Sequence, residues 1–586
     1  MDLSLQALRT PCDSLSTMRA LVRKWALKNA IDHGGRAVEG PVISKAIGED
    51  PGLKERLSEL RAVVSEVVSE VNLLSLEEQR KMLMQLAPEL LESRRTEEKA
   101  LPPLPEAEIG KVVARLPPEP SGYMHLGHGM SGLLNYLYAQ MYEGKLWLRF
   151  EDTNPRKVRK EYYLNFKKGY KWLGIEWDYE KRNSDDMEIY YDKARELIRE
   201  GFAYTCTCPV DEVRRRRRDR VPCQHCVCTP DAVLDEWERM VLGDFQEGEV
   251  TLRLKGNMKS DNAVMRDPTL FRVVRHPHPY AEDKYSAWPT YDLAAAVEDA
   301  ICGITHVLRS SEFALRDELQ EYIRGLLHLQ NPVIIEYSRF NFKGTPLSKR
   351  MLRPLVEAGM VSGWDDPRMP TIDGVERRGI LPEAIREFTV TQTGITQATR
   401  AYHWDLLFAV NRKILDPVTR RYYFVPQPVP CVVTDAPQVP ATLRNHPDKD
   451  LGTRTISTYG RFFLPREDVL KLTSGRLVRL KGLYNIRIEE TSERVVKARF
   501  QGEQLLPDVP IIQWVTDRKL DVIVEVLEDL FVDDEFNEGS LRRVTGFAEE
   551  ACSEIEVGTI VQLERFGFCR LDRREGETLV FIFAHR

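Results

Sequence analysis

Long apolar runs are missing from this chain. No segment approaches the ~18 consecutive apolar residues that a helix needs to span a bilayer. The first residues, MDLSLQALRTPCDSL, lack the basic region followed by an apolar stretch that marks a secretory signal. We therefore expect a cytoplasmic protein without a membrane span. With 586 residues and 42% hydrophobic content the chain fills several cores, and its length predicts roughly three to five domains.

A clear excess of either charge is also missing. Lysine and arginine total 84 against 90 aspartate and glutamate residues, so the net charge is only -6. A nucleic-acid-binding role would therefore depend on local basic patches rather than on overall charge. The five consecutive arginines at residues 214–218 are one such patch. Contact with phosphate and a solvated loop are both open interpretations of it.

The cysteines are too unevenly spread for a disulfide framework. Five of the ten lie within residues 206–228, and in a reducing compartment such a cluster is typical of a metal site. The predicted ligands of a structural Zn²⁺ ion are Cys206, Cys208, Cys223 and Cys226. His225 and Cys228 are further candidates, and free thiols or a site that has lost its ligands are the alternative. Four thiolates leave no open coordination position, so nothing indicates Lewis-acid chemistry.

The segment PPEPSGYMHLGH, residues 117–128, has the pattern of a loop that leads into the first turn of a helix. Gly122 and Gly127 allow a phosphate to approach the backbone closely, and a helix N-terminus favours negative charge. His125 and His128 then lie on one side of that turn. Taken alone, the segment is equally consistent with an ordinary helix start that carries surface histidines.

A second segment, LSKRM at residues 347–351, contributes a cation. Lys349 follows a loop, residues 343–346, that contains glycine and proline. A lysine on such a loop is suited to follow negative charge as it moves onto a leaving group. Together the two segments predict a nucleotide site that breaks a phosphoanhydride bond.

These two segments resemble the two signatures of class I aminoacyl-tRNA synthetases, in the form used by the glutamyl/glutaminyl branch. Residues 148–155, 288–292 and 303–309 are similar to that branch in order and spacing. With the C-terminal region, the resemblance covers most of residues 110–586. One departure is Pro346, which stands where some members carry a first lysine, so that Lys349 alone remains of the pair.

The resemblance implies a reaction that joins an amino-acid carboxylate to the α-phosphate of ATP and expels diphosphate. The predicted catalytic residues are His125 and His128, which would donate hydrogen bonds to the phosphates, and Lys349, which would stabilise the departing diphosphate. Mg²⁺ would bridge the phosphates. The predicted ATP-binding residues are Pro118, Glu119, Pro120, Ser121, Gly122, His125, Gly127, His128, Ser348 and Lys349.

The resemblance also assigns an amino-acid pocket. Arg115 and Glu151 match positions that face the carboxylate and α-amino groups of the substrate, and Tyr291 matches one that lines the side-chain pocket. A buried guanidinium at Arg309 would pair bidentately with a side-chain carboxylate, whereas an amide would leave it unpaired at a cost of ~2–5 kcal/mol. Because glutaminyl enzymes carry a small uncharged residue at the matching position, Arg309 favours L-glutamate.

Several alternatives to this assignment stay open. Arg309 could instead form a structural ion pair with Glu298 or Glu312. The expected activity is the ATP-dependent attachment of glutamate to tRNA(Glu), and a glutaminyl enzyme or a glutamyl enzyme that also charges tRNA(Gln) is the nearest rival. A non-catalytic RNA-binding relative would not need both signatures, and a truncated tRNA-modifying relative would lack the C-terminal region. We expect a monomer.

The N-terminal region differs from the rest of the chain. Apolar residues recur at three- and four-residue steps between residues 57 and 74, which predicts amphipathic helices. The charged run at residues 92–99 and the proline-rich residues 101–105 predict a linker. We therefore expect residues 1–108 to form a helical extension and linker, which resembles those of archaeal-type glutamyl enzymes.

The predicted fold class is multidomain, α/β followed by all-β. Residues 109–350 show the β–helix–β order of a Rossmann-type catalytic domain with a parallel sheet, interrupted at about 200–285 by an insertion that, by resemblance, binds the acceptor stem of tRNA. Residues 351–424 carry the signals of a helical connective domain. Residues 425–586 alternate with a period of two, which predicts β-barrels. By resemblance these are anticodon-binding domains, as in the archaeal/eukaryotic glutamyl and the glutaminyl enzymes.

Overall fold

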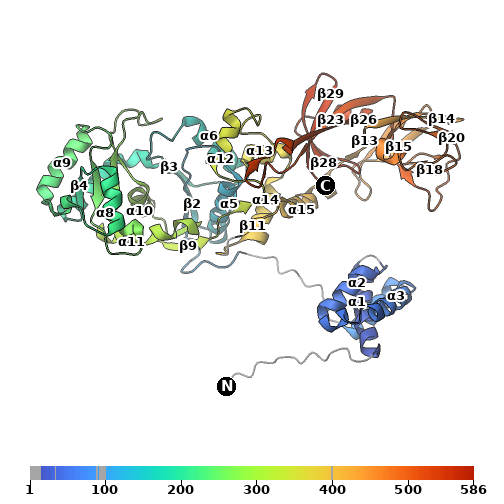
Figure 1. Cartoon of the computed structure of the whole chain (residues 1–586), viewed down its shortest axis with the longest axis horizontal. Helices are drawn as coiled ribbons and strands as arrows, with labels where there is room; N and C mark the ends of the chain where they lie inside the picture. Colours follow the sequence, from blue (N-terminus) through green and yellow to red (C-terminus); the bar gives the residue numbers. More distant parts are fainter. Residues whose placement is uncertain (1–14, 33–34, 88–89, 91–100, 398–399) are drawn as a thin grey trace. The chain divides into compact units, whose positions relative to one another are not determined.

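The chain divides into two compact units, residues 1–100 and 101–586, both shown in Figure 1. The computed structural model describes residues 15–32, 35–87, 90, 101–397 and 400–586. The described helices of the first unit are α1 (Leu15–Asp32), α2 (Glu39–Glu49), α3 (Leu57–Asn72) and α4 (Leu76–Leu86).

The core of the first unit is built on the spacing seen in the sequence. Leu60, Val64 and Val67 of α3 are fully buried, because residues three and four apart share one face of a helix. Gln79 is also fully buried, and its amide donates hydrogen bonds to the carbonyls of Val71 and Leu74 at 3.0 and 3.1 Å. The prediction of amphipathic helices is thus confirmed for α3.

The proline-rich residues 101–105 belong to the second unit and pack against it. Leu104 is 5% exposed, and its N–H donates to the hydroxyl of Tyr142 at 2.8 Å. The carbonyl of Pro102 accepts from the hydroxyl of Tyr138 at 2.9 Å. A proline-rich composition predicts a linker, but it does not specify that the N–H of Leu104 and the carbonyl of Pro102 have partners on a neighbouring surface. The charged run at residues 92–99 lies outside the described residues.

A parallel sheet forms the centre of the second unit. Its strands are β1 (Val113–Leu116), β2 (Lys145–Phe150) and β3 (Tyr179–Arg182), and a further parallel pair is β8 (His306–Ser310) with β9 (Val333–Tyr337). β8 lies beside β1, because the N–H of Thr305 donates to the carbonyl of Val113 at 3.0 Å. The helices around these strands are α5 (Leu126–Met141), α6 (Lys160–Trp172), α10 (Tyr291–Ile301) and α11 (Ala314–Leu326). In such sheets ligands bind at the carboxyl ends of the strands.

The chain between β3 and α10 forms a separate antiparallel sheet. Its strands, in spatial order, are β4 (Ala203–Cys206), β5 (Thr251–Leu254), β6 (Thr269–Val273) and β7 (Ala287–Pro289). The helices of this segment are α7 (Met187–Arg199), α8 (Val210–Asp219) and α9 (Pro230–Leu242). Trp237 and Trp288 are fully buried in its core.

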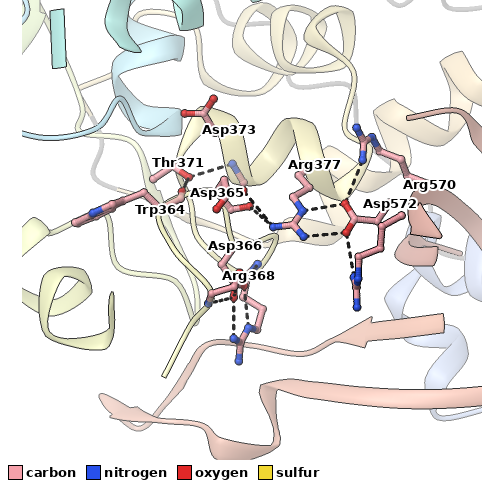
Figure 2. A network of polar contacts seen from close by, with 12 residues as sticks. Trp364, Asp365, Asp366, Arg368, Thr371, Asp373, Arg377, Arg570 and Asp572 are labelled. Atoms are coloured by element: carbon pink, nitrogen blue, oxygen red, sulfur yellow. Dashed lines mark hydrogen bonds and ion pairs between the residues drawn. The ribbon is translucent and has the colours of Figure 1, made fainter. Parts of the chain in front are cut away.

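Four short helices follow the parallel strands β8 and β9. They are α12 (Lys349–Glu357), α13 (Ile372–Arg378), α14 (Pro382–Phe388) and α15 (Trp404–Leu415). α14 and α15 confirm the helical signals in this part of the sequence. Figure 2 shows how α13 is joined to the C-terminal region: the guanidinium of Arg377 donates to both carboxylate oxygens of Asp572 at 2.8 Å.

Two curved sheets of seven strands each make up the C-terminal region, so the predicted all-β, barrel-like tail is confirmed. The first has the order β12 (Arg421–Tyr422), β27 (Ile560–Leu563), β28 (Gly567–Glu575), β29 (Thr578–His585), β23 (Lys519–Leu527), β26 (Leu541–Glu549), β13 (Phe424–Pro426). The second has the order β21 (Ile511–Ile512), β18 (Leu477–Leu480), β19 (Asn485–Thr491), β20 (Val496–Phe500), β14 (Pro428–Thr434), β17 (Arg461–Pro465), β22 (Val515–Thr516). The chain therefore starts the first sheet, builds the second, and returns to complete the first.

Candidate active site

The helix α5 begins with a capping box made of two histidines. The N–H of His128 donates to Nδ1 of His125, and the N–H of His125 donates to Nδ1 of His128, both at 3.3 Å. The two rings stack with their centroids 3.6 Å apart. The three-residue spacing of the histidines thus lets each side chain cap a backbone N–H at the start of α5.

This arrangement fixes the protonation of both rings. A neutral imidazole that accepts a hydrogen bond at Nδ1 carries its proton on Nε2. Burial, together with the charges of Lys349 and Arg339, lowers the pKa of His125 to about 3, and burial also holds the pKa of His128 well below its usual value. At neutral pH both side chains are therefore uncharged and present Nε2–H as a hydrogen-bond donor.

The start of α5 is held by a segment distant in sequence. The N–H of Leu126 donates to the carbonyl of Pro370 at 2.8 Å, and the N–H of Ile372 donates to the carbonyl of Met124 at 2.9 Å. Ile372 is the first residue of α13, the helix that Arg377 joins to Asp572 in Figure 2. Contacts with residues 370–372, which follow the parallel strands in the chain, thus fix the position of the histidine turn.

Lys349 reaches the same loop from α12. Its Nζ donates to Oγ of Ser121 at 2.9 Å, and burial lowers the pKa of the ammonium group. Gly122 makes room for this side chain, because a Cβ there would lie only 2.8 Å from Cε of Lys349. Any larger residue at 122 would displace the lysine.

A cavity of about 300 Å³ lies over the carboxyl ends of the strands. The predicted residues that line it are Arg115, Pro118, Glu119, His125, Gly127, His128, Glu151, Tyr291 and Arg309. Lys349 and Ser121 line a neighbouring cavity that shares Glu119. Pro120, Gly122 and Ser348 line neither of these two cavities. The structure therefore brings most of the predicted nucleotide and amino-acid residues to one place.

Arg115 and Glu151 belong to a buried charge network. Nη1 of Arg115 donates to the carbonyl of Leu308 at 3.1 Å, and its Nε lies 3.6 Å from a carboxylate oxygen of Asp299. Arg149 donates to Asp299 at 2.7 Å and to Glu151 at 3.3 Å. Burial raises the pKa of Glu151 to about 7, although the two arginines oppose the shift. Sequence reasoning gave no role to Arg149 or Asp299; a charged residue inside the apolar strand β2 was the available signal.

Arg309 is 5% exposed and already has protein partners. Nη1 donates to Oε1 of Gln320 at 2.9 Å, and Nη2 forms an ion pair with Asp317. Arg309 therefore does form a structural ion pair, but with Asp317 and not with Glu298 or Glu312. Both true partners lie on α11, whose approach to β8 the sequence alone does not specify.

Glu298 and Glu312 have other neighbours. Glu298 accepts from Tyr190 at 2.5 Å and pairs with Lys181 at 3.0 Å, whereas Glu312 lies 3.6 Å from Arg339. Neither carboxylate is thus available to Arg309.

Aromatic side chains that sequence reasoning missed complete the cavity wall. Tyr337 shares a hydrogen bond of 2.5 Å with Ser131 and stacks on Phe340 with the ring centroids 5.4 Å apart. Burial raises the pKa of Tyr291 to about 12, so its hydroxyl stays protonated at neutral pH. Tyr337 and Phe340 lie at and just after the end of β9, and no local motif marks them.

The structure brings three of the four predicted cysteines together with His225, which the sequence offered as a further candidate. Donor atoms of Cys206, Cys208, Cys223 and His225 all lie within 4.8 Å of one another, and Cys226 is not among them. His225 lies on the short helix at residues 224–227, and its Nδ1 faces the sulfurs of Cys208 and Cys223.

The distances fit a tetrahedral ion. Sγ of Cys223 lies 3.6 Å from that of Cys206 and 3.7 Å from that of Cys208, and Nδ1 of His225 lies 3.4 and 3.6 Å from the Cys223 and Cys208 sulfurs. Zn–S and Zn–N bonds of ~2.3 and ~2.1 Å in tetrahedral geometry place sulfurs ~3.8 Å apart and sulfur and nitrogen ~3.6 Å apart. The donor set and its spacing are therefore suited to Zn²⁺.

Residues 111–417 match the family described as the catalytic domain of class I (E and Q) tRNA synthetases. A glutamate–tRNA ligase from Cenarchaeum symbiosum is 39% identical over 97% of this chain and 100% of its own length. This chain belongs to the class I (E and Q) tRNA synthetases. Residues 419–502 and 511–572 match two families described as anti-codon binding domains of these enzymes. The resemblance to the glutamyl/glutaminyl branch is thus confirmed.

Other relatives of this synthetase agree. The glutamate–tRNA ligase of Pyrococcus abyssi is 40% identical over 96% of this chain and 99% of its own length. Among solved structures, a glutamate–tRNA ligase from Elizabethkingia meningosepticum in complex with its amino acid is 17% identical, covers 52% of this chain and 69% of its own, and has a TM-score of 0.38. That similarity is too low to place any residue of the site.

The matched regions of the synthetase correspond to the fold described above. The catalytic match spans β1 to α15 and contains every predicted site residue, and the two further matches fall on the two C-terminal sheets. Within the described part of the chain, no helix is both long and apolar enough to cross a bilayer.

Proposed function

We propose that this protein is a glutamate–tRNA ligase, which activates L-glutamate with ATP and transfers it to the 3′-terminal adenosine of tRNA(Glu). The observation that carries the proposal is a single cavity that joins two neutral histidine donors to the buried guanidinium of Arg309. The histidine N–H donors are suited to phosphate oxygens, and the guanidinium is suited to a side-chain carboxylate. The names of the relatives support the same activity.

In the activation step a carboxylate oxygen of glutamate attacks the α-phosphorus. The new O–P bond forms as the bond from the α-phosphorus to the bridging oxygen breaks, and the electron pair leaves on diphosphate. Nε2–H of His125 and of His128 would donate to the phosphate oxygens without adding charge, because both rings stay neutral. Lys349, beside Ser121, would meet the charge that develops on the leaving group.

Mg²⁺ fits this site as a companion of ATP. Mg²⁺ keeps most of its water and binds substrate phosphates with few protein ligands. Among the described residues, the cysteine–histidine cluster is the one group of three or more possible metal ligands. The phosphates of ATP would therefore hold the Mg²⁺ ion. Bound there, it would neutralise charge on the diphosphate.

The pocket residues would recognise glutamate at both ends. Arg115 would face the α-carboxylate, Glu151 the α-ammonium group and Tyr291 the side-chain pocket. Arg309 would pair with the γ-carboxylate, which competes with Asp317 for the guanidinium. The side-chain amide of glutamine carries no negative charge with which to displace Asp317 from Arg309, so glutamine would be the poorer substrate.

The remaining regions would bind tRNA. We assign the acceptor stem to the insertion at about residues 200–285 and the anticodon to the barrels at residues 425–586, with a helical connection at 351–424. Zn²⁺ held by Cys206, Cys208, Cys223 and His225 would brace the insertion, because these ligands would join the end of β4 to the short helix at residues 224–227. A tRNA-charging enzyme works where translation takes place, which favours the cytoplasm, and we propose a monomer.

One experiment tests the function directly. The purified protein is offered tRNA(Glu) and tRNA(Gln) side by side, with labelled glutamate or labelled glutamine, ATP and Mg²⁺. We expect glutamate on tRNA(Glu). Glutamine on tRNA(Gln) as the main product would overturn the proposal, and glutamate on both tRNAs would widen it.

A further inference from the structure

Arg253 of β5 is a buried cation without a carboxylate partner. It is 2% exposed, and its Nε and Nη2 donate to the backbone carbonyl of Asp267 at 3.1 and 2.7 Å. The carboxylate of Asp267 accepts instead from the hydroxyl of Tyr204 at 2.8 Å and from the N–H of Gly256 at 2.9 Å. Within the described part of the chain, Arg253 takes part in no ion pair with a carboxylate. A buried charge that is left without a counter-charge is strongly unfavourable.

The remaining nitrogen of Arg253 faces the cysteine cluster. Nη1 donates to Sγ of Cys206 at 3.8 Å. In the antiparallel register of β4 and β5, Cys206 pairs with Thr251 and Tyr204 pairs with Arg253, so Cys206 and Arg253 are diagonal neighbours on one face of the sheet. The guanidinium also lies 5.7 Å from the centroid of the Tyr204 ring. The sheet itself therefore directs this cation at the cluster.

The formal charge of the cluster depends on what it holds. A divalent ion bound by three thiolates and the neutral imidazole of His225 carries one net negative charge. Four thiolates around the same ion would carry two negative charges, and four protonated ligands would carry none. One guanidinium balances the first of these states alone. Arg216 of α8 is already paired with Glu212 at 2.7 Å, which leaves Arg253 as the cation for the cluster.

We propose that Arg253 is the counter-charge of a metal–thiolate cluster, with its Nη1–H bonded to the thiolate of Cys206. The inference rests on the zinc site of the proposed function and is independent of the charging reaction. A donor that stabilises a thiolate ligand and offsets the net charge of the site favours metal binding. Arg253 thereby raises the affinity of the insertion for zinc.

The test measures the zinc affinity of the full chain by competition with a chromophoric chelator. We expect Arg253→Gln to weaken zinc binding by about ten- to a hundredfold, because the thiolates lose their counter-charge and one hydrogen bond. Arg253→Lys keeps the charge and should recover part of the affinity. Arg217→Gln is the matched control and should keep the parent affinity, since Arg217 is a half-buried arginine that donates to the carbonyl of Ala263 at 2.8 Å.

Two further measurements separate this role from that of a brace for the Asp267 carbonyl. Thermal unfolding is recorded for the zinc-loaded and the metal-free forms of each variant. A counter-charge predicts that Arg253→Gln destabilises the zinc-loaded form more than the metal-free form, whereas a brace predicts an equal loss in both. With Co²⁺ in place of zinc, the sulfur-to-cobalt absorption band should shift in Arg253→Gln and move back toward the parent position in Arg253→Lys.

The outcomes distinguish this inference from the zinc site itself. Zinc bound by Arg253→Gln as tightly as by the parent would overturn the role of Arg253 and leave the site in place. An equal loss of stability in both forms, with Arg253→Lys no better than Arg253→Gln, would overturn it as well. A parent chain that binds no zinc would overturn the site and the inference together, and the charging assay with tRNA would report on the proposed function separately.

Discussion

At the scale of single residues, Lys349 is the side chain whose charge matters most to the activation step. Replacing Lys349 with Ala should slow adenylate formation by roughly 100- to 1000-fold, about 3–4 kcal/mol, because the ammonium group meets charge that is complete only in the transition state. ATP–diphosphate exchange measured with tRNA present tests the rate, and the affinity for tRNA should change little. An exchange rate within a few-fold of the parent would contradict the assignment of Lys349.

Arg309 should control the choice of amino acid. Changing Arg309 to Cys should lower kcat/KM for glutamate about a hundredfold and leave ATP binding nearly intact, because the γ-carboxylate loses its cationic partner. Arg115→Ala is the comparison, since a residue that holds the α-carboxylate is needed for either amino acid. Kinetics with glutamate and glutamine decide the matter. If Arg309→Cys kept its preference for glutamate, the pocket assignment would be wrong.

Glu151 should give the reaction a pH dependence near neutrality. The pKa of Glu151 is raised from 4.5 to about 7, mainly by burial, so the carboxylate takes up a proton as the pH falls below 7 and can no longer pair with an ammonium group. We expect kcat/KM for glutamate to fall on the acid side of pH 7 by up to tenfold for each pH unit. The histidines do not titrate in this range, because the pKa of His125 is lowered to about 3 and that of His128 lies well below its usual value.

Glu151→Gln is the control for this pH profile. Burial also raises the pKa of Glu298 to about 7. That carboxylate accepts a hydrogen bond from Tyr190, forms an ion pair with Lys181 and does not line the 300 Å³ cavity. The amide variant should be slow at every pH and lose the acid limb. An unchanged acid limb in Glu151→Gln would move the titration to another group.

At the scale of elements, the insertion should depend on a metal ion. Zinc should co-purify at about one atom per chain, and His225→Ala should lose it, because Nδ1 of His225 converges with the three thiolates. Cys226→Ser is the matched control and should keep the metal. Metal analysis and thermal unfolding test both variants. Zinc retained by His225→Ala and lost from Cys226→Ser would restore the four-thiolate set.

At the scale of the whole molecule, the activation of glutamate should not require the N-terminal unit, residues 1–100. All the proposed site residues lie in the second compact unit, residues 101–586. A chain that begins at Leu101 should therefore keep kcat/KM for glutamate activation within a few-fold of the full chain. The exchange assay with tRNA present measures this. A loss of more than tenfold, with the fold intact by circular dichroism, would give residues 1–100 a part in the reaction.

The sequence by itself determined the features that are local in the chain. The histidine segment, the LSKR segment and the strand and helix periods are read within short windows, since backbone geometry and helix starts depend on neighbours in sequence. These features established the family, the parallel sheet and the all-β tail. The proline-rich residues 101–105 show the limit of this information, because composition predicted a linker but not the surface that these residues cover.

Only the tertiary structure decided which side chains meet across long separations. It brought His225 rather than Cys226 to the other cysteines, gave Arg309 its partners Asp317 and Gln320, and placed Lys349 beside Ser121. The physical reason is that ion pairs, ligand sets and cavities depend on how helices and strands pack, and packing is settled by the summed burial of many residues rather than by any one motif.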